Sequence, residues 1–379
     1  MEEWKTYKIG EICESISDTY KGKAPNVVLV NTSDVYDGVC LNHTYVPNKD
    51  LKGQFKKTFK RNDILYSEIR PANRRFAFVD FAPENYIAST KLMVIRCSKL
   101  VRPRYLYHYL KRQEMLDELQ ALAESRSGTF PQITFSELAL FEISLPSLTT
   151  QDNIVAAIDC FDDKIALNNR INHNLEEQAK ALYKSWFVDF EPFKGGNFVD
   201  SELGMIPEGW RVGTLSELLE VRYGKDHKAL IDGTIPVFGS GGLMRYAERA
   251  LFEGESVLIP RKGTLNNVMY VNGAFWTVDT MFYTVERASN VIKYCHLFLL
   301  TQDLASMNAG SAVPSMTTDI LNNLPLLIPS FQVLEAFNSV VSSIYEARTQ
   351  KEEESNSLSQ SRDIILPQLM SGTLLYENY

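Results

Sequence analysis

The amino-acid sequence predicts an α+β fold in which two pseudo-repeated mixed α/β domains are separated by two long antiparallel coiled-coil helices. Two observations carry this prediction. The chain contains an internal repeat that runs along nearly its whole length, and a heptad-patterned segment occupies the same place in each copy. A length of 379 residues also favours two or three domains.

The repeat appears when the sequence is compared with itself at offsets that shrink along the chain. The clearest matches are Trp4 with Trp210 at an offset of 206, Asp63 with Ser256 at 193, and Pro131 with Pro314 at 183. Insertions and deletions in loops produce such a drift, and the second copy is the shorter one. A repeat of this length indicates a duplicated unit of one domain plus one helix.

Secondary-structure signals follow the same order in both copies. Strand-like runs come first, at Phe76–Val79 and Lys91–Ile95 in the first copy and at Ser256–Pro260 and Thr280–Val285 in the second. Helical runs follow at Tyr105–Leu122 and Ile292–Leu304, and a proline closes each copy, at Pro146 and Pro329. We therefore expect domains at 1–146 and 201–329, with helical spacers at 147–200 and 330–379.

The segments after these two prolines carry apolar residues at heptad a and d positions. The spacer residues are Ile154, Ile158, Phe161, Ile165, Leu175 and Leu182 in the first helix, and Phe337, Val341, Ile344, Leu358 and Ile365 in the second. The middle layers are polar, at Asn168, Asn172, Lys351 and Ser355, and we expect these side chains to bury little. Two such helices would pair antiparallel and hold the domains apart. The alternative is two independent amphipathic helices, each packed on its own domain.

Charge is distributed unevenly. The net charge is −8, yet residues 51–100 hold 11 Lys and Arg against 4 Asp and Glu, whereas residues 301–379 hold 3 against 9. A basic module in an acidic chain fits a DNA-binding face with separate protein-binding faces, or a merely solvated surface. The sequence shows no signal peptide and no apolar run of about 18 residues, so we expect a cytoplasmic protein without a membrane partner.

Motifs for catalysis are weak. The run Val237–Gly242 superficially resembles a glycine-rich cofactor loop, but no clear helix cap follows it, and the chain has no Asn- or Asp-Pro-Pro-aromatic motif to hold a flipped base. Asp63, Glu68 and Lys91 are poorly spaced for a nuclease site, and no pair among the five histidines has metal-ligand spacing. We therefore expect no catalytic residue, no cofactor and no bound metal.

Loops in both copies are rich in residues that contact phosphates and base edges. Asn73 and Asn266 match at the offset of 193, which favours a shared role. The candidate DNA-binding residues are Lys21, Lys23, Lys56, Lys57, Arg70, Asn73, Arg74, Arg75, Arg126, Ser127 and Thr129 in the first copy, and Arg222, Lys225, Lys228, Ser240, Arg245, Arg261, Lys262, Asn266, Asn267 and Ser311 in the second.

Three strings resemble the specificity subunits of type I restriction-modification systems. The run 180–192, which ends Trp-Phe-Val-Asp-Phe-Glu-Pro, resembles the end of their central helix, and 203–210, with Ile-Pro-Glu-Gly-Trp, resembles the entry to their second target-recognition domain. The run 365–372 resembles the end of their C-terminal helix. The order domain, helix, domain, helix covers the whole chain as it does in that family.

This resemblance implies a non-catalytic reader of double-stranded DNA. Each target-recognition domain would read one half of a bipartite site, and the helix pair would set the unread spacer. Two modification subunits would supply the methyl-transfer chemistry, and restriction subunits would join the full complex. Two alternatives from other classes are a catalytic DNA methyltransferase or nuclease, and a duplicated coiled-coil scaffold that does not bind DNA.

Overall fold

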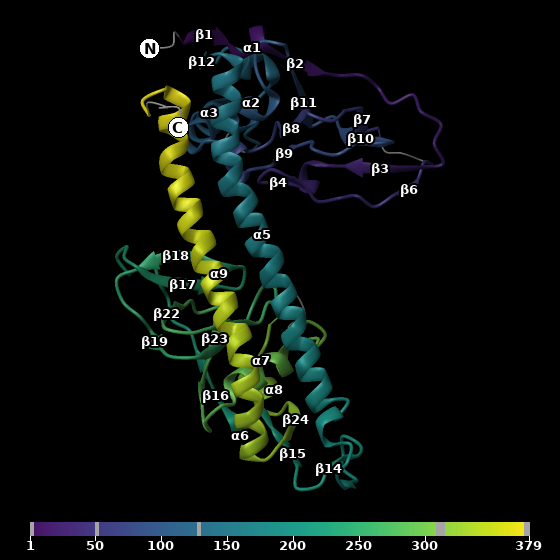
Figure 1. Cartoon of the computed structure of the whole chain (residues 1–379), viewed down its shortest axis with the longest axis vertical. Coiled ribbons are helices and arrows are strands. Elements are labelled where there is room, and N and C mark those ends of the chain that lie inside the picture. Colours follow the sequence, from purple (N-terminus) through teal and green to yellow (C-terminus); the bar gives the residue numbers. More distant parts are fainter. Residues whose placement is uncertain (1–3, 50–52, 127–129, 308–314, 375–379) are drawn as a thin grey trace. The chain divides into compact units, whose positions relative to one another are not determined.

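Figure 1 shows the computed structural model, which describes residues 4–49, 53–126, 130–307 and 315–374. The chain folds into two compact units. Unit 1 comprises Met1–Leu167 together with Glu354–Tyr379, and unit 2 comprises Asn168–Glu353. Each unit therefore takes one β-rich domain and about half of each long helix.

Unit 1 is built on two sheets and a ribbon within its described residues. The first sheet has the order β2 (Cys13–Ile16), β11 (Leu92–Cys97), β8 (Ile64–Ser67), β9 (Phe76–Phe78), all antiparallel. The second has the order β6 (Val46–Pro47), β3 (Asn26–Val30), β10 (Tyr86–Ser89), β7 (Phe55–Lys57), with β3 and β10 parallel. The ribbon pairs β1 (Lys5–Lys8) with β12 (Glu142–Leu145), and a hairpin of β4 (Val35–Tyr36) and β5 (Val39–Cys40) follows β3.

Unit 2 repeats the two sheets and the ribbon strand for strand; the β4–β5 hairpin belongs to unit 1 alone and the β13–β14 pair to unit 2 alone among the described residues. Its first sheet has the order β16 (Leu219–Tyr223), β23 (Met281–Glu286), β20 (Ser256–Pro260), β21 (Met269–Val271). Its second has the order β18 (Gly242–Ala247), β17 (Ile235–Gly239), β22 (Ala274–Thr277), β19 (Phe252–Glu253), with β17 and β22 parallel. The ribbon pairs β15 (Arg211–Thr214) with β24 (Pro325–Ile328), and β13 (Phe198–Val199) pairs with β14 (Ile206–Pro207) ahead of it.

The central strands are buried on both faces, which explains why they read as continuous apolar runs. In β8, Ile64 and Tyr66 face the helices while Leu65 faces the second sheet. In β20, Val257 and Ile259 face the helices while Leu258 faces the second sheet. Successive side chains of a strand point to opposite faces, so each β-rich domain has two cores separated by its first sheet.

Short helices also recur at the expected offsets. Unit 1 has α1 (Ile9–Ile12), α2 (Pro103–Leu110), α3 (Gln113–Arg126) and α4 (Phe135–Leu138), and unit 2 has α6 (Leu215–Leu218), α7 (Ile292–Leu300) and α8 (Thr318–Asn322). The predicted run Tyr105–Leu122 is two helices, because the chain leaves α2 at Lys111-Arg112. Among the described residues, α3 has no counterpart in unit 2, which accounts for part of the shorter second copy.

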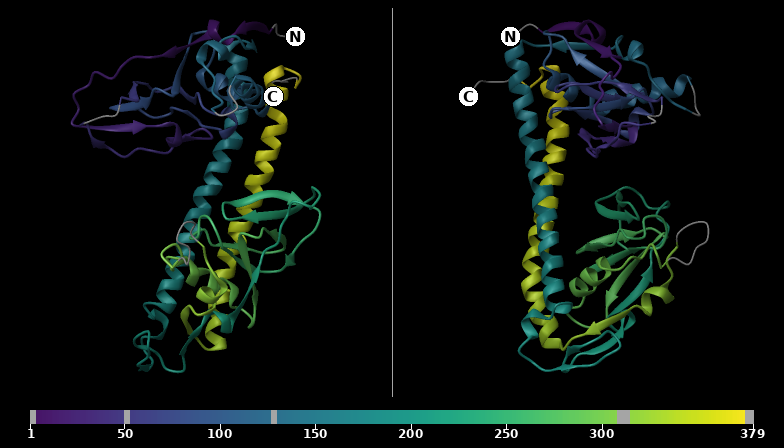
Figure 2. Two further views of the ribbon diagram at one scale, coloured as in Figure 1. Left: turned by 180° about the vertical axis from the view of Figure 1, so that it is seen from behind. Right: turned by 90° about the vertical axis from the view of Figure 1, so that its right-hand side faces the viewer.

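The two long helices are α5 (Leu148–Phe187) and α9 (Phe331–Ser371). In unit 1 they meet where Arg362 donates to Asp162 at 2.6 Å, and in unit 2 where the rings of Phe187 and Phe337 lie 4.8 Å apart. One residue number rises as the other falls, so the helices are antiparallel, as the heptads predicted (Figure 2). Among the described residues, neither helix nor any other is long and apolar enough to cross a bilayer.

The predicted spacer residues differ in burial. Those buried are Ile154, Ile158, Phe337 and Val341, and those half-buried are Phe161, Ile165, Leu175, Leu182, Ile344, Leu358 and Ile365. Within unit 2, Ala179, Tyr183 and Tyr345 are also buried in the core. One expectation was wrong: Asn168 in the polar middle is fully buried.

Candidate nucleic-acid interface

The first candidate reading loop, residues 68–75, joins β8 to β9 and is held in an unusual backbone shape. Arg70 and Arg74 both have left-handed backbone angles, with φ of 45° and 54°, and they flank a 3-10 turn at Pro71–Asn73. The Arg70 amide donates to the Pro131 carbonyl at 3.0 Å, and the Ile133 amide donates to the Glu68 carbonyl at 2.8 Å. These bonds present the Arg70 and Asn73 side chains to solvent.

The second candidate reading loop, residues 261–268, joins β20 to β21 and has the same attachment. The Met316 amide donates to the Arg261 carbonyl at 2.8 Å. An isolated bridge joins Lys262 to Ser315, as another joins Ile69 to Gln132 in unit 1. The two sets of partners match at the sequence offsets of 193 and 183, so both units position this loop with equivalent backbone contacts.

Several predicted DNA contacts make intramolecular bonds through their side chains. They are Lys57 with the Leu92 carbonyl, Arg74 with Asp37, Arg75 with the Ser33 carbonyl, Arg126 with Glu137, Arg222 with Glu220, Arg245 with the Leu230 carbonyl, Arg261 with the Asp279 carbonyl, Asn266 with Asp303, and Asn267 with the Ser240 carbonyl. Burial lowers the pKa of Lys57. These side chains shape the loops, and DNA would have to compete for them.

A second group is exposed and makes no side-chain hydrogen bond or ion pair within the described residues. It consists of Lys21, Lys23, Lys56, Arg70, Asn73, Lys225 and Lys262. Lys228 is also exposed and stabilises the Asp226 carboxylate electrostatically, and Ser240 is half-buried at the tip of the β17–β18 hairpin. Ser127, Thr129 and Ser311 lie outside the described residues. The unengaged cations are the strongest candidates for phosphate contacts, because binding them to DNA breaks no internal bond.

The two motifs that could have suggested an enzyme have structural roles. The glycine-rich run 237–242 ends β17 and enters β18 through a hairpin turn, whereas a dinucleotide loop opens a helix. Asp63 is buried, and its carboxylate accepts two bonds from the Arg96 guanidinium, at 2.7 and 2.8 Å. Asp63 therefore stabilises the fold of the first sheet.

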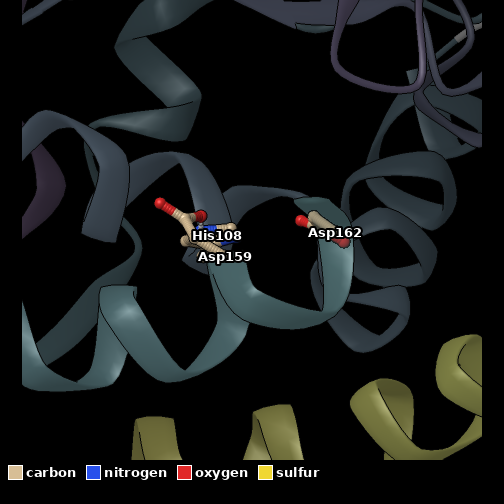
Figure 3. Close-up of side chains that lie close together, drawn as sticks. All are labelled: His108, Asp159 and Asp162. Carbon is tan, nitrogen blue, oxygen red and sulfur yellow. Dashed lines mark hydrogen bonds and ion pairs between the residues drawn. The ribbon is translucent and has the colours of Figure 1, made fainter. Parts of the chain in front are cut away.

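His108, Asp159 and Asp162 form a cluster that sequence spacing did not reveal (Figure 3). Their ligand atoms lie within 4.8 Å of one another, as a metal site would require. Both carboxylates already accept from cations: Asp159 from Arg104 at 2.8 Å, and Asp162 from Lys111 and Arg362 at 2.7 and 2.6 Å. A metal ion would have to displace these groups, so the arrangement suits an ion-pair network better than a metal centre.

The protonation states agree with an ion-pair network. Burial lowers the pKa of His108 to about 4, so the imidazole is neutral at pH 7 and its Nε2 lies 2.8 Å from Asp159. Burial alone would raise the pKa of Asp162, but Lys111 and Arg362 outweigh it and hold the pKa below its ordinary value. The signal that could have found this network is the i, i+4, i+7 spacing of Arg104, His108 and Lys111 on one helix face.

The structure thus contains two copies of one β-rich domain, each with an equivalent loop that exposes polar and cationic side chains. The chain belongs to the family described as the type I restriction modification DNA specificity domain, which matches residues 1–177 and 207–353. This is a family of non-catalytic specificity subunits.

Individual relatives support the assignment over the full length. The chain is 30% identical to the type I restriction enzyme HindI specificity subunit of Haemophilus influenzae, covering 99% of this chain and all of the relative. It is 25% identical to the MjaIX specificity subunit of Methanocaldococcus jannaschii, covering 99% of this chain and 94% of the relative. The crystal structure of an S subunit from M. genitalium shares the fold, with a TM-score of 0.56 at 17% identity over 97% and 96% of the two chains.

Proposed function

We propose that each β-rich domain reads one half of a bipartite double-stranded DNA site, with loop 68–75 in one domain and loop 261–268 in the other at the centre of the contact. The observation that carries this proposal is the equivalent attachment of the two loops, through Ile69–Gln132 and Lys262–Ser315. Two loops built alike but with different side chains are suited to reading two different half-sites. Most of the sequence specificity would come from base-edge contacts in the grooves.

We further propose that the chain works with two modification subunits, which supply S-adenosylmethionine and methyl transfer, and with restriction subunits in the full complex. Full-length similarity to named specificity subunits supports these partners. We also infer that the complex acts in the cytoplasm. The alternative of a catalytic chain would require the purified protein to bind S-adenosylmethionine and to transfer a labelled methyl group to DNA by itself.

Exchanging residues 206–329 for the corresponding segment of another specificity subunit tests whether each domain reads one half-site. The methylated sites of the assembled complex, mapped across a genome, should then change in one half only. A change in both halves would mean that the two domains do not read independently. The reciprocal exchange of residues 1–146 is the matched control and should alter the other half.

The phosphate contacts are tested by salt dependence. Replacing Lys262 with Ala should weaken binding of all DNA sequences by a similar factor, and it should reduce the slope of log K against log salt by about 1. Lys194→Ala is a suitable control, since Lys194 is exposed and already paired with Glu191. A wild-type complex whose DNA affinity did not depend on salt would favour the scaffold alternative.

The helix pair is proposed to set the length of the unread spacer. Each helix of about 40 residues would extend about 60 Å at 1.5 Å per residue. Inserting four residues after position 168 of α5 would lengthen it by about 6 Å. Because both units pair α5 with α9, a matched insertion in α9 is needed to keep the contacts in register. The spacer should lengthen by about one or two base pairs with both half-sites unchanged; methylation at the original spacing would contradict this role.

A further inference from the structure

A β-hairpin beside each candidate reading loop exposes apolar side chains. In unit 2, the β17–β18 hairpin exposes Leu243 (48%) and Met244 (55%). In unit 1, the β4–β5 hairpin exposes Tyr36 (50%) and Val39 (59%). Single exposed apolar residues are common, but in each unit these side chains follow the strand, β3 or β17, that is paired in parallel in the second sheet.

Equivalent residues of the repeat tie these hairpins to the reading loops. In unit 1, the Arg74 guanidinium donates to the Asp37 carboxylate at 2.8 Å, and the Asp37 amide donates to the Arg74 carbonyl at 2.9 Å. In unit 2, the side-chain amide of Asn267 donates to the Ser240 carbonyl at 2.8 Å. Arg74 and Asn267 match at the offset of 193. The hairpin and the loop therefore form one surface in each domain.

In each unit one glycine, in the hairpin of unit 1 and in the reading loop of unit 2, permits a close approach between segments. Gly38 has a φ of 102°, and a side chain there would meet the Tyr107 hydroxyl. In unit 2, a side chain at Gly263 of the reading loop would meet the Ser240 hydroxyl at the hairpin tip. The hydrogen bonds of Arg74 and Asn267 hold each hairpin against its reading loop, which favours a recognition role.

Charge around the hairpin in unit 2 indicates what would cover it. Lys262 precedes Gly263 in the reading loop and is unengaged within the described residues. Lys225 is held nearby by one backbone bond, from its amide to the carbonyl of Thr277, which is the partner of Phe238 in β17. An apolar tip flanked by exposed cations is complementary to a groove of DNA, where phosphates border the base edges.

We propose that Leu243 and Met244, and in the other domain Tyr36 and Val39, enter the major groove and contact the methyl groups of thymine. A two-stranded β-ribbon fits the major groove, and apolar side chains recognise thymine there through its C5-methyl group. This proposal rests on the DNA-reading function proposed above and adds a second reading element to each domain. It predicts an A·T pair at a fixed place in each half-site.

The test replaces single thymines of the mapped target by uracil, which removes only the methyl group. The complex with its modification subunits should bind the uracil duplex roughly fourfold more weakly at one position of the half-site read by unit 2, equivalent to about 0.8 kcal/mol. The double variant Leu243→Ser, Met244→Ser should bind thymine and uracil duplexes alike at that position. Tyr36→Ser with Val39→Ser should do the same for the other half-site.

A closely matched control is the double variant Leu203→Ser, Met205→Ser, since these residues of unit 2 are equally exposed, at 47% and 55%. It should keep the full uracil effect. The proposal is overturned by a half-site without an A·T pair, by an unchanged uracil effect in the hairpin variant, or by loss of modification subunits from that variant. Failure of the DNA-reading function itself is distinguished by Lys262→Ala, which would then leave DNA affinity unchanged.

Discussion

Helix α2 of unit 1 and helix α7 of unit 2 occupy the same place in the repeat but are attached to their surroundings by different chemistry. In unit 1, α2 meets α5 through charged groups, with Arg104 and His108 on Asp159 and Lys111 on Asp162. In unit 2, the contacts of α7 are mainly aromatic, and the ring of Tyr294 lies 4.7 Å from that of Phe187.

The difference extends to the matching positions on the long helices. Asp162 of α5 matches Tyr345 of α9 at the offset of 183. Asp162 accepts from Lys111 and Arg362, whereas Tyr345 hydrogen-bonds His296 at 2.6 Å and packs edge-on against Tyr270 at 4.6 Å. The duplicated fold therefore fixes where α2 and α7 pack, but not the kind of contact. Ion pairs hold α2, whereas packed aromatic rings hold α7.

The largest expected effect comes from the aromatic side of this comparison. Replacing Phe337 with Ala would remove a fully buried ring that packs against Trp186 and Phe187, and should destabilise unit 2 by about 3–5 kcal/mol. Because three of the four tryptophans, Trp186, Trp210 and Trp276, lie in unit 2, urea unfolding followed by tryptophan fluorescence should report the loss.

The matched variant in unit 1 is Ile154→Ala, since Ile154 is buried at the equivalent position. It should cost about 2–5 kcal/mol, but should move the tryptophan transition less, because Trp4 is the one tryptophan of unit 1. Equal shifts of the tryptophan transition in both variants would show that the two units unfold as one.

On the charged side, Asp162→Ala should destabilise unit 1 by about 3 kcal/mol. The variant leaves Lys111 nearly buried without its carboxylate, and Arg362 loses the same partner. Asp163→Ala is the control, since Asp163 is exposed and forms no ion pair within the described residues. Circular dichroism during urea unfolding would measure both. A loss below about 1 kcal/mol for Asp162→Ala would mean that water screens the network.

The sequence predicted which elements of the two units are equivalent and where the two long helices lie, because local patterns determine both. The offsets of 206, 193 and 183 located equivalent elements in both units, and the heptads located α5 and α9, because apolar period reports which face of a helix is buried. The network of Asp159 and Asp162 escaped prediction, since nothing in the heptad at those positions indicates that Arg104, His108 and Lys111 lie opposite. Such contacts join residues about 50 positions apart and depend on how the first sheet folds.

The candidate DNA-binding residues stay a prediction, made from Arg, Lys and Asn content and from the match of Asn73 with Asn266. The structure places several of them on the loops at 68–75 and 261–268. The internal bonds of Arg74 and Asn267 were not predicted, because their partners Asp37 and Ser240 lie on hairpins whose position is set by the parallel pairs β3–β10 and β17–β22. Sequence composition cannot separate a cation that shapes a loop from one that awaits a ligand.

The contacts of α2 with α5 and of α7 with α9 should both become less stabilising in acid. Burial lowers the pKa of His108 to about 4 and that of His296 to about 3, while an unfolded histidine titrates near 6.5. As pH falls below about 6.5 the unfolded chain takes up protons that the folded chain does not. Stability is therefore fully present above pH 6.5 and decreases as pH falls towards 4.

The carboxylates Asp159 and Asp162 extend the loss of stability to lower pH. The pKa values of Asp159 and Asp162 are held below their ordinary values, so their contribution is present above about pH 4 and is lost as pH falls further. His108→Gln and His296→Gln should each flatten the dependence of the urea midpoint on pH between 6.5 and 4. His173→Gln, at an exposed position of α5, should leave it unchanged; an equal flattening by that control would refute the assignment.

The smallest effects are expected at Arg104 and Lys293, which match at an offset of 189 and both hold a carboxylate. Replacing either with Met removes the charged group, which lies over the ring of Phe78 or Tyr270, and keeps an unbranched apolar side chain. The carboxylate left behind is partly exposed and keeps another hydrogen-bonding partner, His108 for Asp159 and Tyr270 for Glu255. Each variant should therefore lose about 1 kcal/mol or less in urea unfolding. A loss above about 2 kcal/mol for Arg104→Met alone would show that unit 1 depends on its whole ionic network, and would widen the contrast between the two units.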